Sequence, residues 1–415
     1  MAVLKPFKAI RPRKDLVHKV AALPYDVMSS EEAREMVKDN PYSFLHVDKA
    51  EIDLDPLIDL YDKKVYEKAR ENLNRMINEG IYIKDKSPFF YIYKLIMGGR
   101  EQTGIVGCTS IDDYQNNIIK KHELTREDKE QDRINHVDYC NAHTGPIFLT
   151  YRAKEEITEI IELWMKNKDA IYDFTAEDHI RHMVWIIDDK SVITQIQNAF
   201  KEIDYLYIAD GHHRAASAVK VGLKRRQEGN YTGEEEFNFF LSVLFPDDQL
   251  HIMDYNRVVK DLNGLSEEEF LKALNDKFIV EKLEETVPYK PGKKHEFGMY
   301  LGNTWYRLTA KKGSFNDDDP VERLDVSILQ NNLLHPILGI TDPRTDKNID
   351  FVGGIRGLKE LEARVQNGME VAFSMYPTSI KDLMDIADAN KIMPPKSTWF
   401  EPKLRSGIFI HSLQE

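Results

Sequence analysis

The sequence predicts a mixed α/β (α+β) protein, and three observations support this class. Short runs of alternating aliphatic and aromatic residues, typical of strands, are interspersed with longer amphipathic segments typical of helices. At 204–219 a strand leads through a glycine turn into a small-residue helix. The 415 residues suffice for two or three domains. A change of pattern near residue 260 divides the chain into 1–260 and a C-terminal α+β domain at 261–415.

The composition excludes several classes of protein. The chain has 57 lysines and arginines against 70 aspartates and glutamates, a net charge of −13, and shows no basic patch for nucleic acid. Cys108 and Cys140 are too few for a disulfide framework. No apolar run is long enough for a signal peptide or a membrane span. We therefore expect a cytoplasmic protein without a nucleic-acid or membrane partner.

The first elements place a carboxylate, Asp26, next to a helix start. Residues 3–10 are typical of a strand, and 21–27 form a second extended piece. Residues 29–32 match a capping box, which starts a helix that ends before Asn40-Pro41. Asp26 thus lies in a loop between strand and helix. Position alone favours a turn or capping role for it.

The middle of the chain supplies framework elements. Residues 55–80 form a long amphipathic helix that stops at Gly80. A β-hairpin follows around Gly98-Gly99, and we expect its Tyr91 and Tyr93 in the core. The other predicted strands and hairpin arms are 182–187, 237–245, 250–258, 277–283, 295–301 and 304–310, and the other predicted helices are 151–169, 321–334, 357–366 and 379–389.

The segment 120–150 is highly charged and carries three histidines. Their spacing matches no standard metal motif, and a solvated helix accounts for most of the charge. The segment also has the residue types that line a polar cleft. The candidates for the substrate side of a site are His122, Glu123, Arg133 and His143.

The most informative stretch is 204–219, DYLYIADGHHRAASAV. A strand, a glycine turn and a helix start leave several backbone N–H groups aimed at one point, where the helix dipole also favours an anion. Around that point lie a carboxylate, two imidazoles and a guanidinium, from Asp210, His212, His213 and Arg214. Arginine is a bidentate phosphate ligand, and a neighbouring aspartate is able to hold a metal ion or a proton. The alternative is a surface turn whose polar residues cap the helix.

The tail at 393–403 is the second informative stretch. Three prolines hold it extended, and lysines bracket two hydroxyl residues and two aromatic residues. A rigid loop of this kind suits a phosphate or a nucleotide, with Lys396, Ser397, Thr398 and Lys403 as the binding candidates. The alternative is a strap that Trp399 and Phe400 anchor over the core.

Over nearly its whole length the chain resembles a family of domains of unknown function, number 1015. The resemblance rests on Pro24-Tyr25-Asp26-Val27, on 122–133, on Asp210-Gly211-His212-His213-Arg214, and on the Pro-Pro-Lys-Ser-Thr-Trp-Phe-Glu-Pro-Lys run at 394–403. The Asp-Gly-His-His-Arg element is also similar to the phosphate-binding turn of the ParB/sulfiredoxin-like fold. The resemblance implies a ParB/sulfiredoxin-like core within 1–260, interrupted by a large insertion at about 46–200.

Within that fold the element most resembles the free serine kinases, which phosphorylate L-serine with a nucleoside phosphate and magnesium. In those kinases an early carboxylate after a proline-containing turn activates the serine hydroxyl, and Asp26 is the matching position here. Sulfiredoxins carry a cysteine where this chain has His212, which excludes thiol chemistry at this site. ParB proteins grip DNA with basic helices, which this acidic chain lacks.

The combined prediction is a kinase that transfers a phosphoryl group from ATP or ADP to a small-molecule hydroxyl, with L-serine as the best acceptor. Gly211 and Arg214 would hold phosphates, Asp210 would bind Mg²⁺, His212 or His213 would stabilise the transferring group, and Asp26 would accept the hydroxyl proton. The alternatives are a nucleotide-hydrolysing switch and a metal-dependent hydrolase with Asp210, His212 and His213 as ligands. Adjacent histidines on one turn usually point apart, which weighs against the hydrolase. The sequence leaves the donor and the oligomeric state open.

Overall fold

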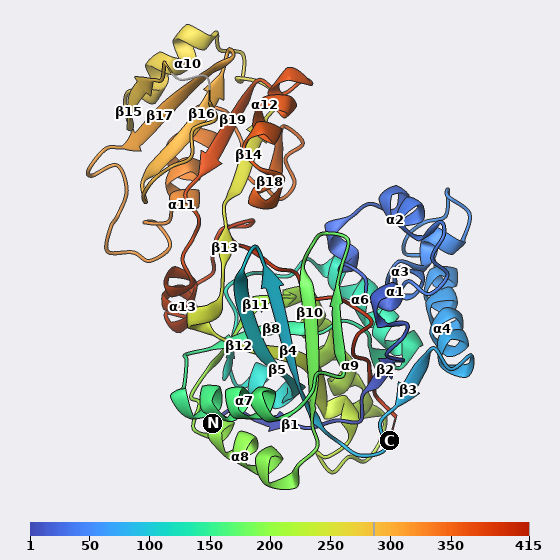
Figure 1. Ribbon diagram of the computed structural model, residues 1–415. Coiled ribbons are helices and arrows are strands. Elements are labelled where there is room, and N and C mark those ends of the chain that lie inside the picture. The colour runs from blue at the N-terminus through green and yellow to red at the C-terminus, as the bar shows by residue number, and fades with distance from the viewer. Residues whose placement is uncertain (285–286, 415) are drawn as a thin grey trace. The chain divides into compact units, whose positions relative to one another are not determined.

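The structure is a computed structural model, and it describes residues 1–284 and 287–414. The fold is mixed α/β, as the sequence predicts. Its residues group into two compact units, coloured along the chain in Figure 1. Unit 1 comprises Met1–Leu250 and Pro402–Glu415, and unit 2 comprises His251–Glu401. Within the described residues, no helix combines the length and the apolar character needed to cross a bilayer.

Unit 1 is built on a nine-stranded mixed sheet, counted over its described residues. The path of eight strands is β6 (Ile119–Lys120), β11 (Leu206–Asp210), β8 (Ile147–Tyr151), β12 (Phe239–Pro246), β5 (Arg100–Ser110), β4 (Phe90–Met97), β10 (Arg181–Ile187) and β9 (Tyr172–Thr175), and β1 (Leu4–Lys5) pairs with β5. β11 runs parallel to β6 and antiparallel to β8. β4 and β5 form the predicted hairpin, and Tyr91 and Tyr93 are fully buried in it.

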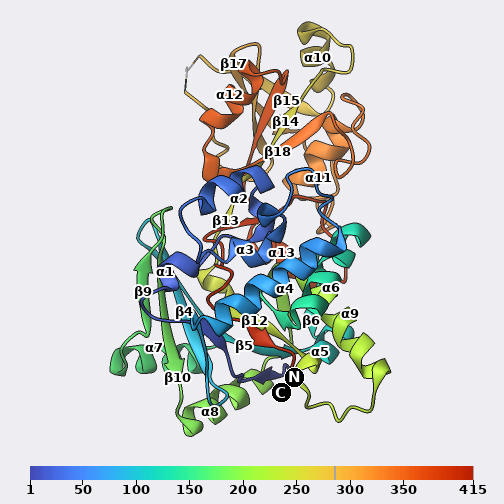
Figure 2. The ribbon, with the colours of Figure 1, turned by 90° about the vertical axis from the view of Figure 1, so that its right-hand side faces the viewer.

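Helices α7 (Glu155–Asn167), α8 (Lys190–Lys201) and α9 (His212–Glu228) share one hydrophobic core with this sheet. α9 contributes Ala215, Ala218 and Val219, the small residues that predicted close packing. α9 in turn packs against α6 (Glu127–Cys140). On its other side, α6 packs against α4 (Lys63–Asn78), as Figure 2 shows. These contacts fix the start of α9 between the sheet and α6.

A second core of unit 1 lies among its N-terminal helices. The elements there are α1 (Val17–Val20), α2 (Ser30–Val37), α3 (Leu45–Asp48), α4, the 3-10 turns η1 (Tyr25–Val27) and η2 (Ala50–Asp53), and the strand pair β2 (Ile10–Pro12) and β3 (Tyr82–Lys84). The capping box that starts α2 forms as predicted, with Ser29 and Glu32 bonded reciprocally. The short helix α5 (Ile111–Gln115) follows β5.

Two sequence predictions for this part are wrong in extent. The strand predicted over 3–10 is divided into β1 and β2, which pair with different strands. The helix predicted over 55–80 begins at Lys63, because Asp62 caps it there. Before that cap, Asp55 and Asp59 accept hydrogen bonds from backbone N–H groups two residues ahead and form turns instead. Leu57, predicted on the apolar face, is 94% exposed.

Unit 2 contains a six-stranded antiparallel sheet in its described part. The strand order is β15 (Phe278–Lys282), β17 (Thr304–Ala310), β16 (Glu296–Leu301), β19 (Val371–Met375), β14 (Tyr255–Val259) and β18 (Ile349–Gly353). Its helices are α10 (Glu267–Leu274), α11 (Asp325–Leu329), η5 (Gln330–Leu334), η6 (Gly354–Arg356), α12 (Lys359–Gln366) and α13 (Ile380–Asp388), and a separate pair joins β13 (Ile252–Met253) to β20 (Trp399–Phe400). The predicted strands and helices of this region are present with shifts of a few residues at their ends.

The hairpin predicted from 237–245 and 250–258 does not form. β12 pairs with β5 and β8 in unit 1, whereas β14 pairs with β18 and β19 in unit 2. The extended segments are adjacent in sequence but find their partners in different sheets. The division between the units therefore falls at Leu250, before the predicted boundary near residue 260.

The last residues of the chain return to unit 1 instead of completing the C-terminal unit. Strand β21 (His411–Ser412) pairs with β7 (Ala142–His143), and Ile410 forms a bridge to Ile10. Ser406 bridges Ala22, next to η1. These backbone bonds hold the end of the chain against β7, Ile10 and Ala22 of unit 1.

Candidate functional site

The predicted strand–turn–helix unit is present. β11 ends at Asp210, Gly211 forms the turn with φ of +95°, and α9 begins at His212. Glycine adopts this left-handed conformation without the steric penalty of a side chain. A Cβ at Gly211 would also lie 3.1 Å from Nε of Arg214, closer than ordinary contact. The turn therefore requires glycine for its conformation and for the space that the arginine occupies.

The guanidinium of Arg214 is folded back over this turn. Its Nη1 donates a hydrogen bond of 2.6 Å to the carbonyl oxygen of Pro146, and its Nη2 lies 3.9 Å from Oδ2 of Asp210. Its Nε is buried and has no hydrogen-bond partner within the described residues. Burial opposes the charge, but Asp210 and Asp26 outweigh it and raise the pKa of Arg214. The cation is therefore permanent and retains one unsatisfied donor.

Lys403 of the tail reaches the same carboxylate. Its Nζ lies 3.2 Å from Oδ2 of Asp210, and its side chain is only 13% exposed. Burial alone would raise the pKa of Asp210, but Lys403 and Arg214 overcome it and lower that pKa to about 2. Asp210 is thus an anion held between two cations, one from the 210–214 motif and one from the tail.

Beside this ion pair, the rings of His122 and His212 meet edge to face, with centroids 4.4 Å apart and planes at 86°. Both rings are buried. Burial lowers the pKa of His122 to about 4 and that of His212 well below its usual value. Both imidazoles are therefore uncharged at neutral pH. Oε2 of Glu123 lies 3.8 Å from Nδ1 of His212.

His213 points elsewhere, as adjacent histidines on one helical turn are expected to do. Its Nε2 accepts a hydrogen bond of 3.0 Å from the backbone N–H of Arg126, just before α6. The proposed metal-ligand set of Asp210, His212 and His213 is therefore not assembled in this structure. His213 instead connects the start of α9 to the start of α6.

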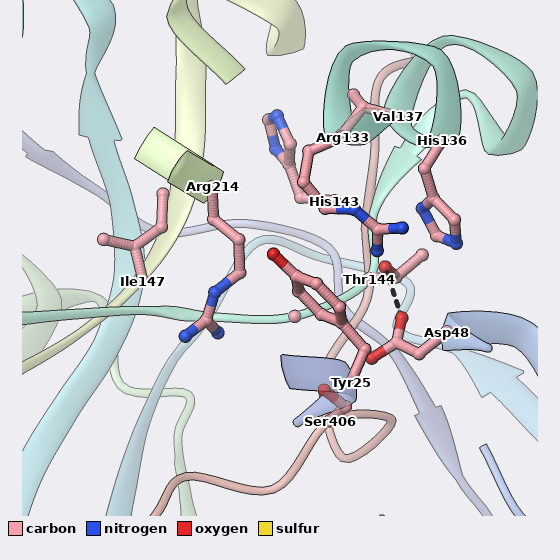
Figure 3. A pocket seen from close by; sticks show the side chains of 11 residues that line it. Tyr25, Asp48, Arg133, His136, Val137, His143, Thr144, Ile147, Arg214 and Ser406 are labelled. Atoms are coloured by element: carbon pink, nitrogen blue, oxygen red, sulfur yellow. Dashed lines mark hydrogen bonds between the residues drawn. The ribbon is translucent and has the colours of Figure 1, made fainter. Parts of the chain in front are cut away.

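A pocket of about 430 Å³, counting space open to solvent, adjoins Arg214. In Figure 3 the ring of Tyr25 lies between the guanidinium groups of Arg133 and Arg214. The Arg133 guanidinium is 4.0 Å from the centre of that ring and also pairs with Asp132. Across the pocket, Asp48 accepts a hydrogen bond of 2.9 Å from Thr144. The pocket thus offers cations and a carboxylate to one bound molecule.

Asp48 and Tyr25 are pocket residues that the sequence analysis did not select as candidates. Asp48 ends a short helix with no motif around it, and its carboxylate is buried, with the residue only 5% exposed. An aspartate is seldom buried to this extent without a partner, but burial cannot be recognised in an isolated four-residue helix. Tyr25 precedes Asp26, so the Pro-Tyr-Asp-Val element was the one available signal.

Asp26 and His143 lie at the edges of this arrangement. Asp26 is exposed on the turn η1, close enough to Arg214 for its charge to raise the pKa of the guanidinium. His143 lines the pocket, but its Nδ1 lies 3.1 Å from Nδ1 of His411, whose Nε2 in turn lies 2.7 Å from Glu236. His143 thus begins a histidine–histidine–glutamate chain that leads from the pocket through His411 to Glu236.

Three predicted phosphate ligands of the tail, Lys396, Ser397 and Thr398, belong to unit 2. The Ser397 hydroxyl donates to the carbonyl of Pro394, and its own carbonyl accepts from Thr378. The Lys396 carbonyl accepts from Arg257. These bonds hold the segment within unit 2, and its role toward phosphate stays a prediction.

The model of the family described as "Protein of unknown function (DUF1015)" matches residues 4–327. No curated protein matches the chain. Among solved structures, the chain is similar to a free serine kinase in complex with AMP, with 14% identity, a TM-score of 0.37 and coverage of 74% of this chain and 91% of the other. A conserved hypothetical protein from Pyrococcus furiosus has 14% identity, a TM-score of 0.36 and coverage of 74% and 95%. SbnI with a C-terminal truncation, from Staphylococcus aureus, has 11% identity, a TM-score of 0.38 and coverage of 74% and 87%.

Proposed function

The chain belongs to this family of proteins of unknown function, and we propose that it is a nucleotide-dependent small-molecule kinase. It transfers a phosphoryl group from ATP or ADP to a hydroxyl, with free L-serine as the acceptor that fits best. The observation that carries the proposal is the convergence of Arg214 and Lys403 on Asp210 at the first turn of α9. This cluster adjoins a pocket that contains Arg133 and Asp48.

The phosphate side of the reaction uses the start of α9. The first N–H groups of a helix have no partners inside it, and the dipole of a 17-residue helix adds positive potential there. Arg214 and Lys403 supply two cations within 4 Å of one carboxylate oxygen. A phosphate at this point would also satisfy the buried Nε of Arg214. The cluster therefore favours an anion with several oxygens.

Magnesium is implied by the resemblance to the serine kinases, and Asp210 is the residue that would hold it. Mg²⁺ usually keeps several waters and is bound through one or two carboxylates together with substrate phosphates. A single carboxylate beside a phosphate site fits that pattern. Bound there, Mg²⁺ would neutralise charge on the nucleotide phosphates. His212, which is buried and uncharged, would contact the transferring group.

The acceptor side uses the pocket of Figure 3. Free serine is a zwitterion, so its carboxylate requires a cation and its ammonium requires an anion. Arg133 and Asp48, which both line the pocket, provide this pair. Asp26, on the turn that carries Tyr25, would accept the hydroxyl proton. The serine oxygen then bonds to the terminal phosphorus while the bond to the bridging oxygen of the nucleotide breaks.

The proposal is tested by incubating the full chain with Mg²⁺, either ATP or ADP, and a pool of amino acids and sugars. Mass spectrometry then searches for a new phosphate ester. The expected product is O-phosphoserine, and Asp48→Asn should raise the KM for serine with little change in the KM for nucleotide. Nucleotide hydrolysis without any phosphate ester would instead support a nucleotide-hydrolysing switch protein. A phosphate ester formed only on a sugar would exclude the assignment of the pocket to an amino acid.

A further inference from the structure

Three side chains beside the first turn of α9 form a cluster of metal-ligand types, and the proposed kinase reaction gives a role to only one of them, His212. They are His122 and Glu123, which follow β6, and His212, the first residue of α9. One ligand atom from each lies within 4.8 Å of the other two. The two histidines are 2% and 6% exposed, and all three residues belong to unit 1.

The histidine rings have nitrogens that nothing in the described chain satisfies. Nδ1 of His122 and Nε2 of His212 are both buried without a hydrogen-bond partner. The other nitrogen of His212 lies 3.8 Å from Glu123, which is too long for a hydrogen bond. Buried polar atoms are nearly always paired in native proteins. Two unpaired imidazole nitrogens next to a carboxylate therefore indicate a missing ligand that accepts electron pairs.

We propose that His122, Glu123 and His212 bind a divalent transition-metal ion of the zinc class. Two imidazole nitrogens and one carboxylate oxygen form a common ligand set for Zn²⁺, and one that suits Mn²⁺, Fe²⁺ and Co²⁺. Mg²⁺ prefers an all-oxygen environment, so this site differs from the Mg²⁺ position at Asp210. Three protein ligands leave at least one position for water or another ligand.

The geometry requires only a small contraction to reach metal-binding distances. Ligand atoms bonded to one zinc at about 2.0–2.2 Å in a tetrahedron lie about 3.3–3.6 Å apart. In this structure the ligand atoms are up to 4.8 Å apart. Rotation of the partly exposed Glu123 side chain and of the two imidazole rings would shorten these distances to the required range. The charged side chains that act on the two histidines are Asp210 and Lys121. The carboxylate of Asp210 is already paired with Lys403.

Other histidine groups of the chain are poorer candidates. The rings of His143 and His411 approach at 3.1 Å between nitrogens, which is a hydrogen-bond distance and needs no ion. His213 has its Nε2 occupied by the backbone N–H of Arg126. Among the residues that the structure describes, His122, Glu123 and His212 form the cluster in which buried, unpartnered imidazole nitrogens lie next to a carboxylate.

The test uses the tag-free full chain without nucleotide, so its result does not depend on the proposed kinase activity. After treatment with a chelator, the protein is titrated with Zn²⁺ by calorimetry and with Co²⁺ by visible absorption, and metal content is measured after dialysis. We expect one equivalent of zinc, visible Co²⁺ bands in the same protein, and no displacement by millimolar Mg²⁺. His122→Gln and His212→Gln should each weaken zinc binding at least about tenfold.

His213→Gln and the exposed His18→Gln are the matched controls and should bind zinc as the wild type does. Glu123→Gln keeps the shape of a partly exposed side chain and decides the case if a histidine variant fails to fold. The proposal is overturned if the wild type retains no more zinc than the His122→Gln/His212→Gln double variant. It is equally overturned if His213→Gln loses the metal, or if Glu123→Gln binds it at full affinity.

Discussion

Two carboxylates divide the proposed reaction between them. Asp210 is held between Lys403 and Arg214, whereas Asp26 lies exposed on the turn that borders the acceptor pocket. Asp210→Asn should impair every reaction of the bound nucleotide and raise the Mg²⁺ concentration needed for the activity that remains. Asp26→Asn should leave nucleotide and Mg²⁺ binding nearly intact and reduce transfer about 10²–10⁴-fold. Nucleotide titrations and product assays on both variants measure the two effects separately.

If Asp26→Asn transfers at the normal rate, Asp26 is not the base, although the phosphate site is unaffected by that result. Glu123 and the buried His122 would then be the next residues to substitute. A loss of nucleotide binding in Asp26→Asn would contradict the division of tasks itself.

Arg214 is the residue on which nucleotide affinity should depend most. Arg214→Ala removes a permanent, largely buried cation and should weaken nucleotide binding by roughly 1.5–3 kcal/mol, as a charge-assisted contact does. Lys224→Ala removes the same charge from the other end of α9, where the side chain is 54% exposed, and should not change the affinity. Calorimetry measures the nucleotide affinity of both variants. If Arg214→Ala binds nucleotide as tightly as Lys224→Ala does, the phosphates bind elsewhere.

A buried carboxyl in unit 2 predicts a pH dependence of stability. Oδ1 of Asp325 accepts the backbone N–H of His295, while its Oδ2 is buried and unpartnered in the described structure. Burial raises the pKa of Asp325 from 3.8 to about 7. Because the folded-state pKa is the higher one, this contribution to stability is complete below pH 4 and is lost as pH rises through 7.

The full shift corresponds to roughly 4 kcal/mol as an upper bound. Asp325→Asn carries no such charge, so urea denaturation should show a flatter dependence of its unfolding free energy on pH between 5 and 8. The exposed Asp318→Asn serves as the control and should follow the wild type. An unchanged slope in Asp325→Asn would mean that the carboxyl is not the group that titrates.

At the scale of elements, the turn between β11 and α9 is the part that tolerates least change. Gly211→Ala forces a side chain into the left-handed region, at a cost of about 1–2 kcal/mol, and presses on Arg214. We expect a lower unfolding free energy together with weaker nucleotide binding. Gly229→Ala, at the other end of α9, is the control, since its φ is −167° and no described atom lies within 4 Å of the new Cβ. If both variants bind nucleotide equally, the turn does not shape the site.

Elements that local chemistry determines were predictable from the sequence. The turn at Gly211, the capping box at Ser29 and the hairpin at Gly98-Gly99 all depend on residues a few positions apart. The predictions that failed depended on distant partners. The sequences of β12 and β14 are typical of the two arms of one hairpin, but the strands pair in different sheets. Strand pairing of this kind depends on residues far away in the chain, so no local pattern predicts it.

At the scale of the whole molecule, the same limit explains what the sequence revealed of the site. The sequence alone was enough to select the motif at 210–214 and the residues His122, Glu123 and Arg133, because their side chains have the types that bind phosphate, metal or substrate. Lys403 meets Asp210 because the last residues return to unit 1 through β21 and Ile410. Asp48 and Thr144 line one pocket only because tertiary packing brings α3 beside the segment between β7 and β8. The assembly was unpredictable because it depends on tertiary packing.

The central claim is that a phosphoryl group passes from a nucleotide to a hydroxyl at this site. The most direct measurement uses ATP or ADP with ¹⁸O-labelled terminal phosphate, the full chain, Mg²⁺ and L-serine, and follows the label by mass spectrometry. We predict O-phosphoserine that carries the intact labelled phosphoryl group with the wild type, and none with Arg214→Ala/Asp210→Asn. Label found only in inorganic phosphate, with unmodified serine, would contradict the account.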